Sequence, residues 1–156
     1  MAAPAQTPAT AVEYGHVEPL WTHFDDLDLM GMVHNTRYPV LVERALTGHW
    51  TRQGFDFVNG VYSKPDVVIV VAEFSISYRA PIRGTNPIGV HLWVEKVGQS
   101  SATYGFRVLS ADGATVHAEG RRVHIRLDQA THRPTPWTDE ARAVLDALAK
   151  PQETSA

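Results

Sequence analysis

The chain has 156 residues, of which 44% are hydrophobic and 20% charged, a composition typical of one globular domain with its own core. Its formal net charge of −3 gives no general reason to expect nucleic acid or an anionic membrane as a partner. The absence of cysteine excludes disulfides, thiolate zinc sites and a cysteine nucleophile.

The N-terminal residues are rich in alanine and proline and lack the basic start and long apolar centre of a signal peptide. No apolar run approaches the length of a membrane span. We therefore expect a cytoplasmic protein with a disordered tail over residues 1–13. A globular domain over 14–128 should follow, and then a C-terminal loop, short helix and frayed end over 129–156.

The first elements in chain order are a strand, an acidic loop and a helix. Residues 14–24 read as the strand, and residues 25–31 form a loop with three carboxylates and a glycine. A helix is expected from near Thr36 to Gly54, with Pro39 tolerated in its first turn. Its apolar residues fall at i, i+3, i+4, i+7 and i+8, which predicts one buried face made of Tyr38, Leu41, Val42, Ala45 and Leu46.

The rest of the chain is mostly strand. Strand-like apolar patterns cover residues 67–79, 88–94, 102–108 and 116–127. Ala111-Asp112-Gly113 is a strong hairpin signal between the last two. Thr138 is expected to cap a short helix whose apolar face carries Ala141, Val144, Leu145 and Leu148.

Short turns between adjacent strands imply an antiparallel sheet, and a helix this apolar needs a sheet wrapped around it. One helix covers only one face of such a sheet. We expect a second copy of the chain to cover an edge or the remaining face, giving a homodimer or homotetramer.

The loop that leads into the helix carries a family resemblance. Residues 26–38 read Asp-Leu-Asp-Leu-Met-Gly-Met-Val-His-Asn-Thr-Arg-Tyr. This stretch is similar to the pattern D-x-D-x-x-G-H-V-N-N-x-x-Y of the 4-hydroxybenzoyl-CoA thioesterase-like family of hotdog-fold proteins. The order of elements and Glu43 on the helix agree with it. Met32 and His34 depart from the pattern, and the turn at 97–99, basic in some relatives, is neutral here.

The resemblance implies an α+β hotdog fold, a five-stranded antiparallel sheet wrapped around one long central helix, plus a short C-terminal helix. It also implies an acyl-CoA or acyl-carrier thioesterase that needs no cofactor, coenzyme A being part of the substrate. Asp28 stands at the position of the family's catalytic carboxylate, which acts as base or nucleophile. Asn35 stands at the position whose main-chain N–H polarises the thioester carbonyl in the family. Further residues expected to bind substrate are Gly31, Val33, His34, Thr36, Tyr38 and Glu43.

The chemistry of the loop agrees with these roles. Thioester hydrolysis needs an attacking oxygen and a group that holds the developing oxyanion. The first amides of a helix have no helical acceptor and lie at the positive end of the helix dipole. Gly31 lets the backbone bend, so that carboxylate and amides face one point.

Several of these residues also have simpler explanations. Asp28 could be an ordinary loop or capping aspartate, and Asp26 is expected to accept hydrogen bonds from the loop. His34 could contact substrate or merely fill a polar loop position. Glu43 could orient water, make a structural hydrogen bond or face a second copy.

A calcium site of the EF-hand type is rejected. Asp26, Asp28 and Gly31 match loop positions one, three and six, but Met30 and Arg37 stand where oxygen ligands are required. The histidines show no zinc-binding spacing, so we expect no metal.

Two further groups of residues are ambiguous. The arginines of the last strand could meet phosphates of coenzyme A, but solvated positions on the strand are favoured; these are Arg121, Arg122 and Arg126. Aromatic residues at the end of the helix could line an acyl pocket, but core packing explains them equally well; these are Trp50, Phe55, Phe57 and Tyr62.

Two other functions remain open at this stage. A non-catalytic module that binds acyl thioesters is compatible with the fold, because a fold does not fix its function. A hotdog hydratase or dehydratase ranks lower, since the chain does not display the histidine base with an acid partner that this chemistry requires.

Overall fold

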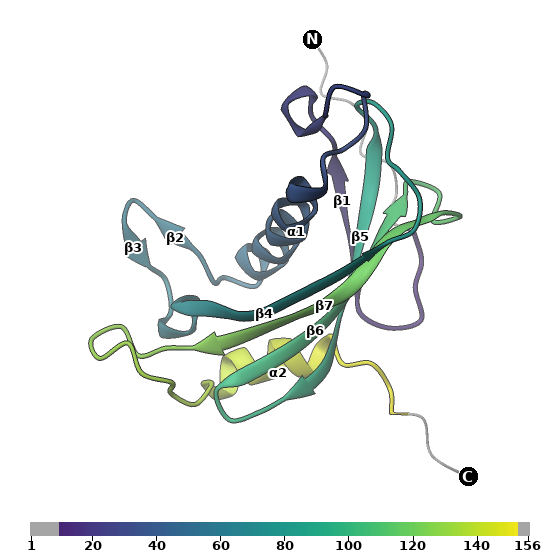
Figure 1. Ribbon diagram of the computed structural model, residues 1–156. Coiled ribbons are helices and arrows are strands. Elements are labelled where there is room, and N and C mark those ends of the chain that lie inside the picture. The colour runs from purple at the N-terminus through teal and green to yellow at the C-terminus, as the bar shows by residue number, and fades with distance from the viewer. Residues whose placement is uncertain (1–9, 153–156) are drawn as a thin grey trace.

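A five-stranded antiparallel sheet curves around one long helix in the computed structural model, which describes residues 10–152 (Figure 1). The strand order is β1-β5-β6-β7-β4. The strands are β1 (His16–Trp21), β4 (Ile69–Tyr78), β5 (Pro87–Val97), β6 (Ser101–Ser110) and β7 (Val116–Arg126). The helix α1 (Tyr38–Arg52) lies in the concave face of the sheet. The expected hotdog arrangement is confirmed.

The helix α1 presents the apolar face that the sequence predicts. Leu41, Val42 and Ala45 are completely buried, and they share a core with the inward side chains of β5, β6 and β7. A short 3-10 helix, η2 (Asn35–Arg37), precedes α1, and Pro39 stands in the first turn, where a missing N–H costs little. Gly54 has a φ of +86° just after the helix, the conformation in which glycine ends a helix readily.

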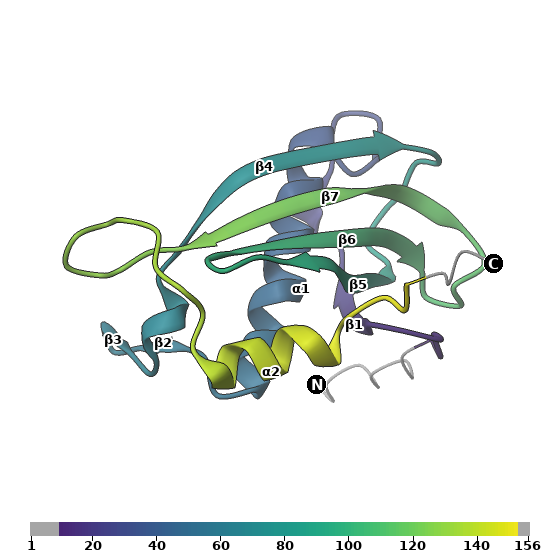
Figure 2. The ribbon, with the colours of Figure 1, turned by 90° about the horizontal axis from the view of Figure 1, so that it is seen from below.

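The C-terminal helix α2 (Asp139–Ala147) also belongs to the core. The Thr138 side chain caps it by accepting a hydrogen bond from the Ala141 amide at 3.2 Å. Figure 2 shows α2 lying alongside β5. Beyond the end of β1, the segment after α2 pairs with the edge of β5. The Val94 amide donates a hydrogen bond to the Leu148 carbonyl, and the Val94 carbonyl accepts one from the Lys150 amide. The predicted helix with its Thr138 cap is therefore confirmed.

A small hairpin between α1 and β4 was not predicted from the sequence. It consists of β2 (Phe57–Val58) and β3 (Val61–Tyr62), joined by Asn59 and Gly60 with φ of 53° and 75°. The other short elements are η1 (Phe24–Asp26) and η3 (Pro65–Val67). The first strand, expected over 14–24, is shorter because the chain turns into η1.

The outer strand β4 pairs only with β7 within the chain. Val70, Val71 and Tyr78 on this edge are each more than 40% exposed. No helix among residues 10–152 is long and apolar enough to cross a membrane. The expected tail over 1–13 lies mostly, and the frayed end over 153–156 entirely, outside the described residues.

Candidate active site

The loop between β1 and α1 is fixed by the completely buried carboxylate of Asp26. It accepts a hydrogen bond from the His23 amide and one from Arg37 Nε, each at 2.8 Å, and Arg44 lies at 3.8 Å. Burial alone would raise the pKa of Asp26, but these hydrogen bonds and charges outweigh it and lower the pKa. Asp26 is thus a structural anchor, as the sequence indicates.

Asp28 stands at the start of a tight turn. Its Oδ1 accepts hydrogen bonds from the amides of Met30 at 2.8 Å and Met32 at 3.1 Å. Gly31 closes the turn with a φ of +73° and donates its amide to the carbonyl of Asp28. Among residues 10–152, no hydrogen-bond donor reaches Oδ2 of Asp28. One carboxylate oxygen therefore positions the side chain and the other stays available.

The start of the helix leaves one main-chain donor without an acceptor. The Val33 amide donates to Ile82 and the His34 amide to Asp26, while the Thr36 amide is capped by Nδ1 of His34 at 3.2 Å. The Asn35 amide makes no hydrogen bond to any described residue. Its carbonyl accepts from the Tyr78 hydroxyl at 3.1 Å.

A pocket of about 380 Å³ brings the carboxylate and this amide to a common space. Its walls are Asp28, Met32, Val33, His34, Asn35, Tyr38, Tyr78, Arg79, Ala80 and Pro81. Of the expected site residues, Gly31, Thr36 and Glu43 are not part of this wall. Tyr78 was missed by the sequence reading, although its place at the end of the alternating stretch from Phe74 put it on the same face of β4 as the core.

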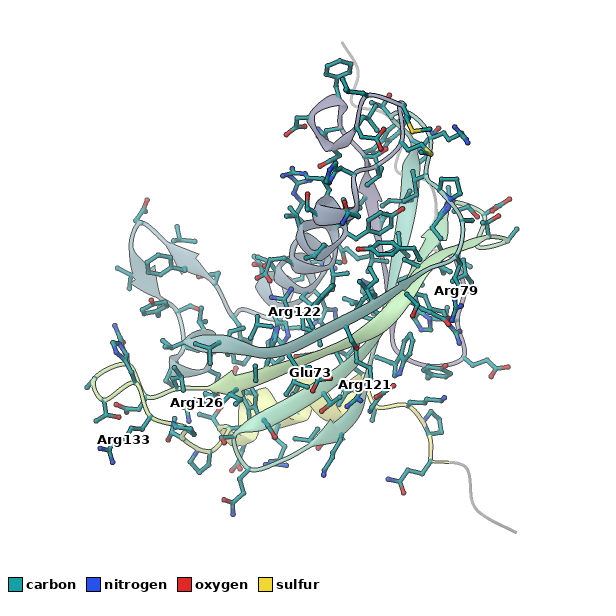
Figure 3. All side chains as sticks on the ribbon, viewed as in Figure 1. Glu73, Arg79, Arg121, Arg122, Arg126 and Arg133 are labelled. Carbon is teal, nitrogen blue, oxygen red and sulfur yellow. The ribbon has the colours of Figure 1, made fainter. Side chains whose placement is uncertain are left out.

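Glu43 lies two turns farther along α1 and pairs with Arg122 of β7. Arg122 is 5% exposed, because it points from the concave face of the sheet toward α1. Figure 3 shows Arg122 on the side of α1 and its neighbour Arg121 on the opposite side of the sheet. The expectation that Arg122 is solvated is wrong. Adjacent residues of a strand face opposite sides, so one of the two arginines had to turn inward.

A second cavity of about 400 Å³ opens at the C-terminal end of α1. Trp50, Phe55 and Phe57 line it, whereas Tyr62 lies outside its wall and stacks on Phe57 with ring centroids 4.4 Å apart. Tyr104 and His124 form its floor on the sheet. Over the described part of the chain, no three His, Cys, Asp or Glu residues are grouped so that they could hold a metal ion.

Comparisons with known proteins identify the family of this chain. The family model of the Thioesterase superfamily matches residues 30–117, more than half of the chain, beginning two residues after Asp28. "Putative acyl-CoA thioesterase YneP" of Bacillus subtilis is 25% identical over 111 residues, which is 71% of this chain and 78% of YneP.

Solved structures show the same fold. The PA5185 protein of Pseudomonas aeruginosa superposes with a TM-score of 0.77 at 28% identity, over 90% of this chain and 96% of that one. A thioesterase of Thermus thermophilus, solved with coenzyme A and zinc, gives a TM-score of 0.69 at 24% identity, covering 85% of this chain and 92% of its own.

Proposed function

The chain belongs to the thioesterase superfamily and is a thioester hydrolase, and we propose that it cleaves acyl-CoA or acyl-carrier thioesters with Asp28 and the Asn35 amide. One observation supports this most directly. Asp28 and Asn35 line the same pocket, and among residues 10–152 one carboxylate oxygen of Asp28 and the N–H of Asn35 have no hydrogen-bond partner. That pairing supplies both the attacking group and the oxyanion donor that the reaction needs.

The reaction follows from this pairing. The thioester carbonyl oxygen accepts the Asn35 N–H, which polarises the carbon and holds the negative charge that develops on the oxygen. Asp28 either takes a proton from the attacking water or attacks the carbon itself. In the second route a mixed anhydride forms and water then cleaves it. Both routes end with a carboxylic acid and a free thiol.

The residues around the pair have supporting roles in this proposal. Gly31 shapes the turn that aims Asp28, and His34 with Thr36 caps the chain next to the Asn35 amide. Val33 and Tyr38 wall the pocket that receives the thioester. The expected contact of Glu43 with substrate would be made outside this pocket, farther along α1.

We propose coenzyme A as the favoured carrier and a homodimer or homotetramer as the working form. The name of the Bacillus relative and the coenzyme A in the Thermus structure support the carrier. The unpaired edge of β4, with Val70 and Val71 exposed, supports association through this strand. The domain limits 14–128 and a cytoplasmic location stay predictions from the sequence.

A panel of short, long and aromatic acyl-CoAs tests the proposal. The Asp28→Asn protein should lose about a thousandfold in kcat for every substrate, because its amide is a poor base and nucleophile. The matched variant Asp25→Asn, whose side chain is 75% exposed, should keep wild-type kcat. Circular dichroism checks that both variants are folded.

Two results would contradict this function. A folded Asp28→Asn protein with wild-type turnover would remove Asp28 from the chemistry. A wild-type protein that binds acyl-CoAs without hydrolysing any of them would favour the non-catalytic binding module.

A further inference from the structure

The cavity at the C-terminal end of α1 is aromatic but not purely apolar. Trp50, Phe55, Phe57 and Trp137 form much of its wall, and its volume is about 400 Å³. His124, on the floor, is 5% exposed. A buried polar group normally finds a partner, so its hydrogen bonds decide what the cavity can hold.

His124 points an N–H into this cavity. Arg122 Nε donates to Nε2 of His124 at 2.8 Å, and a guanidinium can only donate. The ring proton must therefore be on Nδ1, since burial and the Arg122 charge lower the His124 pKa to about 3 and keep the ring neutral. Nδ1 has no partner among residues 10–152. Nδ1 is not among the fully buried, unpartnered side-chain atoms of that part of the chain, which are Trp93 Nε1 and Arg126 Nε. It therefore keeps some accessible surface, and His124 lines the cavity.

Tyr104 supplies a second donor beside the first. Its hydroxyl oxygen accepts a hydrogen bond from Trp50 Nε1 at 3.0 Å, and its own O–H has no acceptor among the described residues. Burial raises the Tyr104 pKa, so the hydroxyl keeps its proton. The rings of Tyr104 and His124 lie 5.1 Å apart, edge to face, on the same cavity wall. Two unused donors thus meet in one aromatic cavity.

The charges around the cavity favour a neutral ligand. Glu43, Asp56 and Asp66 all line it. Glu43 is paired with Arg122, and Asp66 lies 3.2 Å from Arg126 and also accepts from Thr138. Asp56 has no ion pair with any described residue, so an anionic group would meet its charge, whereas a neutral carbonyl oxygen would accept from both donors without that repulsion.

A groove along α1 lies between this cavity and the region of Asp28. It has a volume of about 670 Å³, begins at Pro39, next to Tyr38 in the wall of the Asp28 pocket, and shares Glu43 and Thr47 with the cavity. From Tyr38 to Thr47 a helix rises by about 13 Å. An extended acyl chain spans that distance in about eleven bonds, at about 1.2 Å per bond.

We propose that this cavity holds the far end of the acyl group and selects acyl chains that carry a neutral hydrogen-bond acceptor, such as a keto oxygen, roughly ten carbons from the thioester. His124 and Tyr104 are then specificity-determining residues that take no part in the bond cleavage. The inference rests on the proposed function only in placing the thioester at Asp28.

Hydrolysis of two matched thioesters tests it. Dodecanoyl-CoA is compared with its counterpart that has a keto group next to the terminal carbon, ten carbons from the thioester carbon. The wild type should prefer the keto substrate by about tenfold in kcat/KM, since each unmet donor costs binding. Tyr104→Phe should reduce that preference severalfold, whereas Tyr14→Phe, outside the cavity wall, should not change it. Equal kcat/KM for both substrates in the wild type, or an unchanged preference in Tyr104→Phe, would overturn the proposal.

Binding of the two free acids separates this proposal from the proposed function. Trp50 and Trp137 line the cavity, so their fluorescence reports its occupation. The keto acid should bind about tenfold more tightly than dodecanoic acid to the wild type, and this difference should shrink in His124→Phe. If no acyl-CoA is hydrolysed but the binding difference is found, the cavity proposal stands and the thioesterase site does not. If neither acid binds, or both bind equally, the cavity proposal is wrong.

Discussion

The two ends of α1 offer the protein different kinds of chemistry. At the N-terminal end, the groups that we propose to react come from one continuous stretch of chain. Main-chain amides there hold Asp28, and the Asn35 amide has no acceptor among residues 10–152. In the cavity at the C-terminal end, side chains from separate elements meet: Tyr104 of β6 lies beside His124 of β7. Glu43, from the first half of α1, also lines this cavity and pairs with Arg122.

If Asp28 and Asn35 cleave the thioester and the cavity holds the acyl group, as we propose, the N-terminal end of α1 sets the rate and the C-terminal end sets the selectivity for substrates. A main-chain donor and one carboxylate treat every thioester alike, so changes at the N-terminal end should alter kcat for all substrates together. Side chains in a cavity contact only the acyl group, so changes at the C-terminal end should alter the ranking of substrates. Substitutions at each end can break or sharpen this division.

The largest effect on stability is expected at the N-terminal end. Asp26→Ala should lower the free energy of unfolding by about 3 kcal/mol, because it leaves Arg37 without its buried partner and the His23 amide without an acceptor. Urea denaturation measures it, and the exposed neighbour variant Asp25→Ala should change stability by less than about 0.5 kcal/mol. Equal effects of the two variants would show that Asp26 is not the anchor of the loop.

As the pH falls, protonation of His124 should destabilise the fold before protonation of Asp26 does. The His124 pKa is lowered from 6.5 to about 3. Between these two pH values His124 is therefore protonated in the unfolded chain and neutral in the folded chain. Stability from this group is complete above pH 6.5 and falls by about 1.4 kcal/mol per pH unit below it. The contribution of Asp26, whose pKa is lowered from 3.8, is lost only below that pH.

His124→Gln tests that order, because glutamine can still accept the Arg122 hydrogen bond and does not titrate. Its unfolding free energy, measured from pH 7 to pH 4, should depend less steeply on pH than that of the wild type. An identical slope would exclude His124 as a source of the acid sensitivity.

The smallest effect concerns the rim of the cavity. Phe57→Ala should lower kcat/KM for long acyl-CoAs about threefold relative to short ones, with little change in melting temperature, because Phe57 lines the cavity but is 55% exposed. Val61→Ala on the same hairpin, outside the cavity wall, is the control. A uniform loss across chain lengths in Phe57→Ala would place the hairpin outside substrate selection.

The residues that lie together at the N-terminal end of α1 could be predicted from the sequence, because they are neighbours in the chain. Asp28, Gly31 and Asn35 fall within one loop, and a local pattern carries their spacing. The core face of α1 was predicted for the same reason, since helical periodicity is local.

The contacts around the cavity at the C-terminal end could not be predicted in that way. Arg122 and Glu43 stand 79 positions apart, and neither residue type indicates that they meet. The missed hairpin had a local signal, Asn59-Gly60 between Val58 and Val61, the dipeptide that best fits a tight turn. Its strands have two residues each, too short to show alternation.

Removal of the single Asn35 N–H tests the central claim most directly. Proline suits this position, because Asn35 is the first residue of η2 and His34 has the extended backbone that a residue before proline prefers, with φ −64° and ψ 139°. Asn35→Pro should lower kcat by about a hundredfold or more for every acyl-CoA at an unchanged melting temperature, whereas Asn35→Ala, which keeps the N–H, should retain most of the activity. Wild-type kcat in Asn35→Pro, or an equal loss in Asn35→Ala, would contradict a site in which this amide and Asp28 act on the same thioester.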